Sequence, residues 1–208
     1  MVFDAATPAC VSRCWPSRIV GAWFVLGSPH AQAHQAAIHG TDFTDGLMQF
    51  LTSVEFPLGT IALGLFAAQR GRDAVAWSVI ALPIGLIAGA IAAPFAAMGP
   101  GVVIANLAAI AILGLAVALA VPVPAFVLPI AAFLLGIGQG FPNTGTMPSG
   151  ALPELFLLGV VVAALLSLVG ATALAWKAQT PWQRVAVRAL GSWISAIGLM
   201  VLGLQLAA

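Results

Sequence analysis

The sequence predicts an all-α integral membrane protein, a compact bundle of six transmembrane helices after an N-terminal signal segment. The chain has 208 residues, of which 62% are hydrophobic and only 6% are charged, whereas a soluble domain carries about 25% charged residues. Apolar segments recur along the chain, and about 20 such residues suffice to cross a bilayer. These segments are continuously apolar rather than alternating, which argues against a β-barrel.

Residues 1–33 are typical of a secretory signal peptide. Arg13 and Arg18 supply its positive region, residues 19–27 form a short apolar core, and residues 31–33 read Ala-Gln-Ala, which matches the A-x-A cleavage pattern. The core is too short to span a bilayer. An uncleaved anchoring segment is the alternative interpretation.

Residues 34–45 are predicted to be a periplasmic N-terminal arm. The arm contains His34 and His39, and these are N-terminal metal candidates because imidazole suits Ni(II) and Cu(II). The alternative is a solvated arm without a metal, because chain termini are poorly ordered unless tied down. Asp42 and Asp45 follow at the predicted entrance to the first span.

Residues 46–208 are predicted to form the six-helix transmembrane domain, in which turns rich in Gly, Pro or charge separate the apolar runs. The fourth run is short, and the segment after it, FPNTGTMPSG (141–150), is predicted to be a polar loop. The predicted spans are residues 46–68, 74–97, 102–121, 125–139, 152–176 and 186–207.

Positive charge predicts the orientation. Lys and Arg are enriched in cytoplasmic loops, so a bacterial inner-membrane protein with both termini in the periplasm is expected. Nucleic acid is excluded as a partner because there is no basic patch, and the lipid bilayer is the expected surrounding. After the signal segment, the positive residues lie only around the first and fifth turns: Arg70, Arg72, Lys177, Arg184 and Arg188.

Small residues at four-residue spacing predict where the helices pack. Helices in lipid approach one another closely at Gly, Ala and Ser. Gly85 and Gly89 form such a pair in the second span, and Gly159, Ala163 and Ser167 form a stripe in the fifth. Packing within one chain is the first interpretation, and a homo-oligomer or a larger membrane complex is the alternative.

Glu55 is the acidic residue that lies deepest in an apolar segment, near the middle of the predicted first span. A charge at the bilayer centre costs about 2.5–3.5 kcal/mol on insertion scales, so such a residue is a functional-site hypothesis by default. Gln49 lies on a neighbouring part of the same helix surface. The structural alternative is a hydrogen bond from Glu55 to Asn106, Ser78 or Ser167 on another helix.

Three stretches, LGLFAAQRGRDAVAW (63–77), GIGQGFPNTGTMP (136–148) and LGVVVAALLSLVG (158–170), resemble the HupE/UreJ family. These are small six-span proteins associated with hydrogenase and urease operons and regarded as nickel or cobalt permeases. The resemblance covers the chain after the signal segment in span count and loop position. It implies a six-span fold and a role in metal transport.

The chain departs from the family pattern at every intramembrane histidine. By that resemblance, the histidine positions hold Gln49, Phe56, Gln139, Asn143 and Ser167, while Glu55 stands at the family's aspartate. The resemblance therefore implies a metal site of Glu55, Gln49, Gln139 and Asn143. Carboxylate and amide oxygens suit harder ions such as Mg(II), Ca(II) or Mn(II).

Three functions remain open at this point. The leading hypothesis is a permease-like protein that transports a divalent metal cation of the nickel or cobalt type with altered ligands. The alternatives are a non-transporting accessory or structural subunit of a larger membrane complex, and a permease for another small solute. An enzyme is not expected, because no Ser/His/Asp set, H-E-x-x-H motif or phosphate loop can be assembled from the spans, and no cofactor beyond a transported metal ion is implied.

Overall fold

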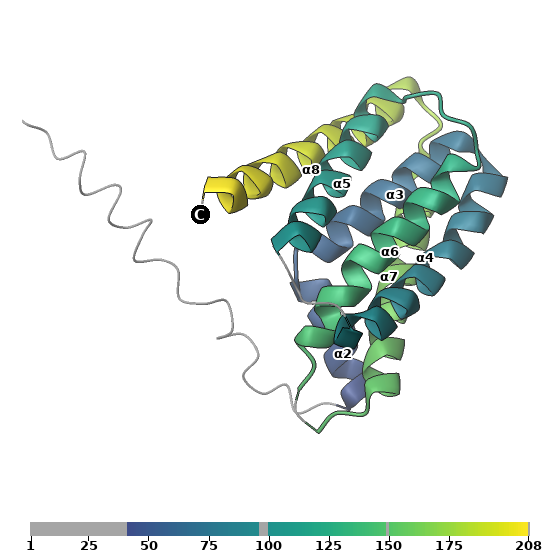
Figure 1. Cartoon of the computed structure of the whole chain (residues 1–208). Helices are drawn as coiled ribbons and strands as arrows, with labels where there is room; N and C mark the ends of the chain where they lie inside the picture. The colour runs from purple at the N-terminus through teal and green to yellow at the C-terminus, as the bar shows by residue number, and fades with distance from the viewer. Residues whose placement is uncertain (1–40, 96–99, 149, 208) are drawn as a thin grey trace, which may run out of the picture. The chain divides into compact units, whose positions relative to one another are not determined.

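The structure, a computed structural model, describes residues 41–95, 100–148 and 150–207. The predicted signal peptide and the metal candidates His34 and His39 lie outside these residues. Figure 1 shows a bundle of helices, which in chain order are α2 (Asp42–Thr52), α3 (Glu55–Arg70), α4 (Arg72–Ala92), the short 3₁₀ helix η2 (Ala93–Phe95), α5 (Pro100–Leu119), α6 (Val127–Gly145), α7 (Pro153–Lys177) and α8 (Pro181–Ala207).

The predicted fold class, an all-α membrane protein, is confirmed. Among the described residues, five helices are long and apolar enough to cross a membrane, or six if the bent pair of α2 and α3 counts as one span. Large apolar side chains such as Ile91, Leu134 and Trp193 are exposed on the outside of the bundle. An outer surface of this kind fits lipid, which solvates apolar groups as well as a protein core does.

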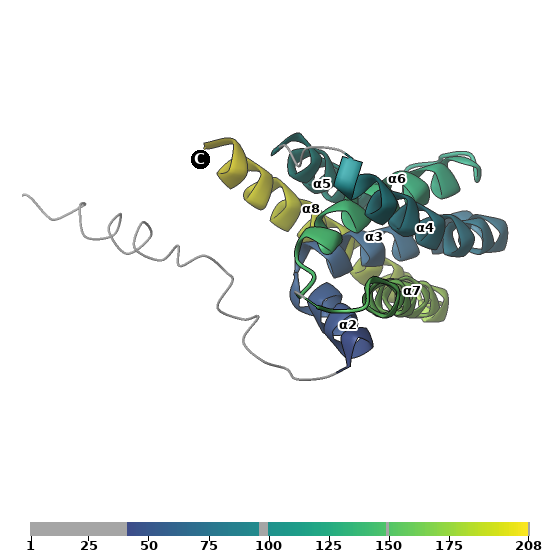
Figure 2. The same cartoon turned by 60° about the horizontal axis from the view of Figure 1, so that its bottom comes forward.

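Helix α3 is the central element of the bundle (Figure 2). It contacts α4, α5, α6, α7 and α8, and its run from Ala62 to Ala67 is buried without a gap. A helix that is covered on all sides must be apolar all round, and the sequence ALGLFA supplies this.

Glycines set the closest approach between α4 and α6. A Cβ added to Gly85 would meet the backbone of Phe133, and one added to Gly89 would meet the backbone of Ile137. Between these two contacts the residue number rises by four in both helices, so α4 and α6 run parallel. Close backbone approach replaces the hydrophobic driving force that helices lack in lipid.

A second tight contact holds α2 and α3 against α7. A Cβ on Gly159 would meet the Phe43 carbonyl oxygen, and one on Gly64 would lie 2.5 Å from the Leu168 carbonyl oxygen. Ala163 is fully buried, and the Ser167 hydroxyl donates to the Ala163 carbonyl at 2.8 Å. The small-residue stripe of α7 is thus used within one chain.

The predicted first span, 46–68, is not one continuous helix. Helix α2 ends at Thr52, α3 begins at Glu55, and the two axes are bent by 75°. Pro57 gives the physical reason, because proline has no N–H to donate to the Ser53 carbonyl and its ring crowds that carbonyl. The predicted first span therefore consists of two helices rather than one.

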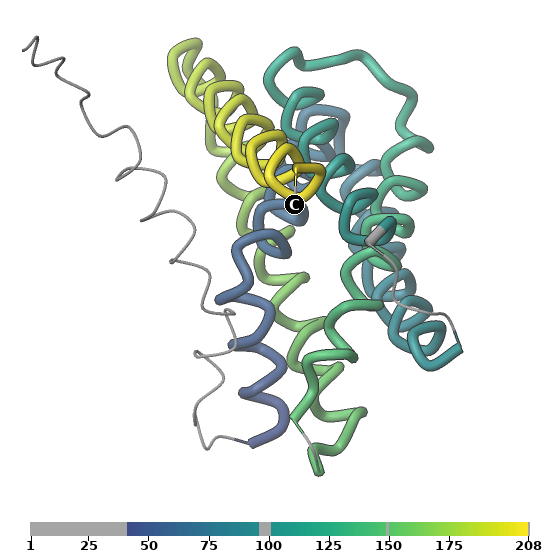
Figure 3. The backbone as a smooth tube through the Cα atoms, turned by 60° about the vertical axis from the view of Figure 1, so that its left-hand side comes forward, coloured from purple at the N-terminus to yellow at the C-terminus, as the bar shows by residue number. Residues whose placement is uncertain are grey.

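The broken pair nevertheless makes a single crossing. The start of α2 lies beside the start of α7, where Asp42 accepts a hydrogen bond from the Leu152 backbone at 3.0 Å. Further along, the Thr172 hydroxyl of α7 donates to the Gly64 carbonyl of α3 at 3.2 Å. Because α2 and α3 contact successively later parts of α7, the broken pair leads from the start of α7 towards its end (Figure 3).

The fourth span is longer than predicted. Helix α6 continues to Gly145 with Pro142 inside it, so the first half of the predicted loop 141–150 is helical. Polar side chains bond the carbonyls of this last turn: the Thr144 hydroxyl donates to the Phe141 carbonyl at 2.8 Å, and the Thr146 hydroxyl donates to the Asn143 carbonyl at 2.9 Å. These bonds allow a segment rich in turn residues to stay helical.

The predicted arm, 34–45, also overlaps a helix. Helix α2 begins at Asp42, and Thr41 caps it by accepting a bond from the Thr44 backbone at 3.5 Å. Asp42 and Asp45 therefore lie in the first turn of α2, where carboxylates stabilise a helix through its dipole.

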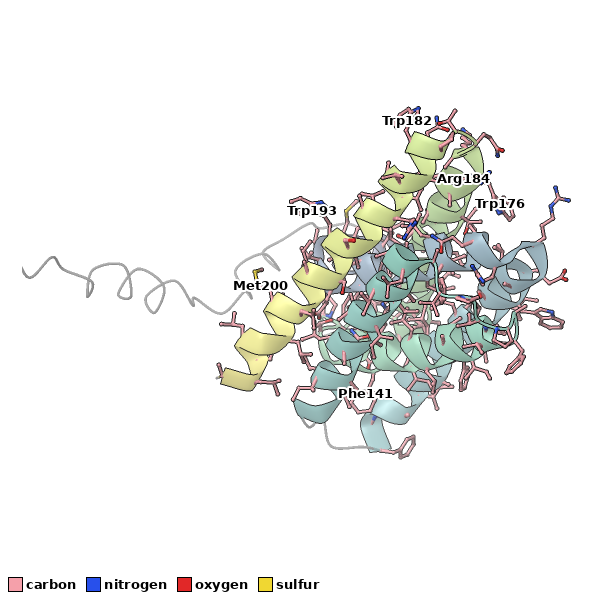
Figure 4. All side chains as sticks on the ribbon, turned by 90° about the horizontal axis from the view of Figure 1, so that it is seen from above. Phe141, Trp176, Trp182, Arg184, Trp193 and Met200 are labelled. Carbon is pink, nitrogen blue, oxygen red and sulfur yellow. The ribbon has the colours of Figure 1, made fainter. Side chains whose placement is uncertain are left out.

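The positive residues gather at the opposite end of the bundle, because α3 and α7 end there and α4 and α8 begin there. Figure 4 shows Trp176, Trp182 and Arg184 at this end, as expected for aromatic residues at a membrane interface. Arg70 and Arg188 donate to the Ala120 and Ala118 carbonyls, at 3.5 and 2.7 Å. Both arginines thereby donate hydrogen bonds to carbonyl groups at the C-terminal end of α5.

The tight contact of α4 with α6 gives a first prediction. Gly85→Ala should lower the free energy of unfolding by about 1–3 kcal/mol, because the added methyl overpacks against backbone that cannot move aside. Thermal unfolding of the purified chain in detergent measures this. Gly170→Ala is the matched control, because nothing lies within 4 Å of a Cβ at that position; equal destabilisation of the two variants would contradict the packing argument.

Candidate functional site

The candidate site lies where the break in the first span meets α5 and α6. Non-helical backbone at membrane depth is tolerated where protein buries it or where it lines a cavity. Here the first turn of α3 is covered: Phe56 and Gly59 are buried, and a Cβ on Gly59 would lie 3.2 Å from side-chain atoms of both Ile110 and Leu135. Neighbouring helices therefore cover the inner side of the break, while Thr52 and Val54 on its outer side are exposed.

Glu55 is the first residue of α3, directly after the break. Its side chain is half-buried, and among the described residues it has no hydrogen-bond or ion-pair partner. Its position at a helix N-terminus favours a negative charge, because the helix dipole is positive there. The structural alternative, a bond to Asn106, Ser78 or Ser167, is not what the structure shows. The Ser78 and Ser167 hydroxyls instead donate to carbonyls of their own helices.

Gln139 of α6 reaches across to the break. Its amide nitrogen donates to the Phe56 carbonyl at 3.1 Å, and its side chain is fully buried. Gly59 leaves the room for this amide, because a Cβ there would lie 2.8 Å from the Gln139 nitrogen. The Gln139 side-chain oxygen is buried without a hydrogen-bond partner.

Asn143 lies one helical turn after Gln139 and is also buried, with 1% of its surface exposed. It is part of α6 rather than of an external loop. Its amide nitrogen donates to the Gln139 backbone carbonyl at 2.7 Å, and its side-chain oxygen has no partner. Two of the predicted ligand residues thus occupy one buried face of one helix.

Asn106 of α5 adds a residue that the sequence analysis considered only as a partner for Glu55. It is 6% exposed, and its side-chain oxygen is buried without a partner. That oxygen lies 3.3 Å from where a Cβ on Gly138 would be, beside the residue that precedes Gln139. A lone Asn in an apolar helix was the available signal, but only the fold shows what it lies against.

The other predicted residues lie elsewhere. The Gln49 amide donates to the Ser53 hydroxyl at 3.4 Å on the α2 side of the break, and no hydrogen bond links it to Gln139 or Asn143. Asp42 is engaged with the α7 backbone as described above, and Asp45 is half-buried in the first turn of α2. The structure therefore groups Gln139 and Asn143 with the first turn of α3 and leaves Gln49 apart.

The donor atoms at this site are oxygens. In the ranges that the structure describes there is no histidine, and no group of three His, Cys, Asp or Glu residues could hold a metal ion. Leaving a buried hydrogen-bonding atom unpaired costs about 1–3 kcal/mol, so three unpaired amide oxygens close to the break are an expensive arrangement. Oxygen atoms of this kind can accept hydrogen bonds or bind a hard cation.

The close fit of Gln139 over Gly59 gives a second prediction. Gly59→Ala should destabilise the chain by about 1–3 kcal/mol through overpacking against the Gln139 amide. In a Gln139→Ala background the same change should cost clearly less, because the amide is gone. A double-mutant cycle of thermal unfolding measures the coupling, and strictly additive effects would contradict the contact.

Comparison with known proteins identifies the family to which the chain belongs. No curated protein and no solved structure matches the chain. A family model does match, that of the HupE / UreJ protein, over residues 22–201, which is most of the chain. Together with the membrane-spanning helices, this match makes the chain a multi-pass membrane protein and supports a metal-related role in general. The chain belongs to the HupE/UreJ family.

Proposed function

We propose that this protein is an inner-membrane permease for a divalent metal cation, with oxygen ligands in place of the family's imidazoles. One observation carries the proposal: Glu55 stands half-buried and unpartnered at a break inside a membrane span. Ionisable residues within spans mark ion pathways by default. In transporters of several folds, the ends of discontinuous helices form the ion site near the middle of the bilayer.

Charge supports the proposed orientation and entrance. The end of the bundle that carries Arg70, Arg72 and Lys177 is the cytoplasmic end under the positive-inside rule. The opposite end, which is then periplasmic, begins α2 with Asp42 and Asp45 and α7 with Glu154. Acidic residues at an opening raise the local concentration of cations. Both chain termini are periplasmic in this orientation.

The route runs from this acidic end towards the break in the first span. Helix α2 has 11 residues, which correspond to about 16 Å at 1.5 Å per residue. A cation that enters near Asp45 therefore reaches Glu55 after crossing the outer part of the membrane. Glu55 supplies the negative charge there, and the amides of Gln139 and Asn143 supply neutral oxygens.

Metal accumulation in cells tests the proposal. Cells that express the protein are expected to accumulate nickel, cobalt or manganese above the empty-vector level. Glu55→Gln should return accumulation to that level without lowering the amount of protein in the membrane, because it removes the one charge at the break. Elemental analysis of washed cells measures the metal.

Asp73→Asn is the matched control, because it also turns a carboxylate into an amide, at an exposed residue in the first turn of α4 at the opposite end of the bundle. This variant should keep most of the accumulation. If none of the three metals accumulates while the protein is present in the membrane, the permease function is contradicted. The non-transporting accessory subunit then becomes the leading function.

A further inference from the structure

Three buried amides near the break form what we define as the amide triad: Asn106, Gln139 and Asn143. Their exposed fractions are 6%, 0% and 1%, and each has a side-chain oxygen without a hydrogen-bond partner. At the other end of α3, the Gln69 side-chain oxygen and the Arg70 Nε are also buried without a partner, whereas several buried hydroxyls in the described residues do have partners. The hydroxyls of Thr60 and Thr172, for example, donate to backbone carbonyls.

For two of these amides, a neighbouring backbone carbonyl shows which side-chain atom is nitrogen and which is oxygen. The Gln139 nitrogen faces the Phe56 carbonyl, and the Asn143 nitrogen faces the Gln139 carbonyl. A flipped amide would place two acceptor oxygens against each other in either case. The free atom of Gln139 and of Asn143 is therefore an oxygen, which can only accept a hydrogen bond or bind a cation.

Gln139 and Asn106 lie at one depth in the bundle, and Asn143 lies one helical turn nearer the end of α6, with its amide nitrogen directed back to the Gln139 carbonyl. Gln139 precedes the last residue of α6, Gly145, by six residues, and Asn106 follows the first residue of α5, Pro100, by six. Each is thus about 9 Å from the same end of the bundle at 1.5 Å per residue. Two glycines leave space for these side chains: Gly59 faces the Gln139 amide, and Gly138 faces the Asn106 oxygen.

We infer that the amide triad binds a hard divalent cation of the manganese or magnesium class, and that Asn106 is a specificity-determining ligand of this site. Amide and carboxylate oxygens suit such ions, whereas imidazole favours nickel. Glu55 directly precedes Phe56, whose carbonyl receives Gln139, and it provides the only carboxylate on this turn of α3. The inference rests on the proposed function, since it names the class of ion that the permease takes.

Mn(II) and Ni(II) are the probes for the test. The full chain is purified in lipid nanodiscs with His30, His34 and His39 changed to Ala, because these are all the histidines of the chain and would bind nickel by themselves. Isothermal titration is expected to show Mn(II) binding, with Ni(II) no more than about tenfold tighter, since oxygen donors lack the imidazole that favours nickel.

Two substitutions at Asn106 decide the role of the triad. Asn106→Leu should weaken Mn(II) binding by about 10–100-fold, as losses around a metal site do. Asn106→Asp keeps the shape of the side chain and should tighten Mn(II) binding by about tenfold, because ligand charge tunes affinity for hard cations. Thr172→Val is the control, because this buried hydroxyl lies on α7 and bonds Gly64 and Leu168; it should leave Mn(II) binding unchanged.

Three results would overturn the inference: no Mn(II) binding, Ni(II) binding more than about a hundredfold tighter than Mn(II), or Mn(II) binding that neither Asn106 variant alters. If Asn106→Leu does not reach the membrane, Asn106→Asp alone decides. Failure of the proposed function is a different result. If Mn(II) binding depends on Asn106 but cells accumulate no metal, the permease function is contradicted and the metal site is supported. If accumulation depends on Glu55 but not on Asn106, the permease function is supported and the proposed metal site is contradicted.

Discussion

Backbone hydrogen bonding is the constraint on which the rest of this structure depends. A bilayer offers no water to an unpaired N–H or C=O group, so spans are helical unless protein covers the exception. The break between α2 and α3 is such an exception: α5 and α6 cover the first turn of α3 on its inner side, while Val54 remains exposed on the outer side. The bond from Gln139 to the Phe56 carbonyl serves this need, because it satisfies backbone at the break.

Glycine contacts supply the closeness that this coverage requires. In water, burying apolar surface would bring the helices together, but lipid is as apolar as leucine, so van der Waals packing of backbones has to do so. The pairs α4 with α6 and α2 with α7 touch through Gly85, Gly89, Gly46 and Gly159.

Much of the fold could be predicted from the sequence, because hydropathy is a local property; the four spans other than the first and fourth were placed within a few residues. The two failures lie where the local composition is compatible with more than one backbone structure. Pro57 bends its span, whereas Pro83 lies inside the continuous helix α4, so proline alone does not predict a break. The segment Phe141 to Gly145 has the composition of a turn, yet its threonines bond the last helical carbonyls. At the site, the sequence identified Glu55, Gln139 and Asn143 as unusual polar residues, but the position of Asn106 depends on how α5 lies against α6.

The pairing of the first span with α7 has a consequence for how the protein is made. The bond between Gly64 and Thr172 joins residues 108 positions apart, and ribosomes add about 5–20 residues per second. The broken span therefore waits for about 5–20 s of synthesis before its covering helix exists. During that time Glu55 and the open backbone beside it need shelter from lipid, which the insertion machinery or the intervening helices α4 to α6 must provide. Final docking of the first span is thus a late event in assembly, although that span is the first to be synthesised.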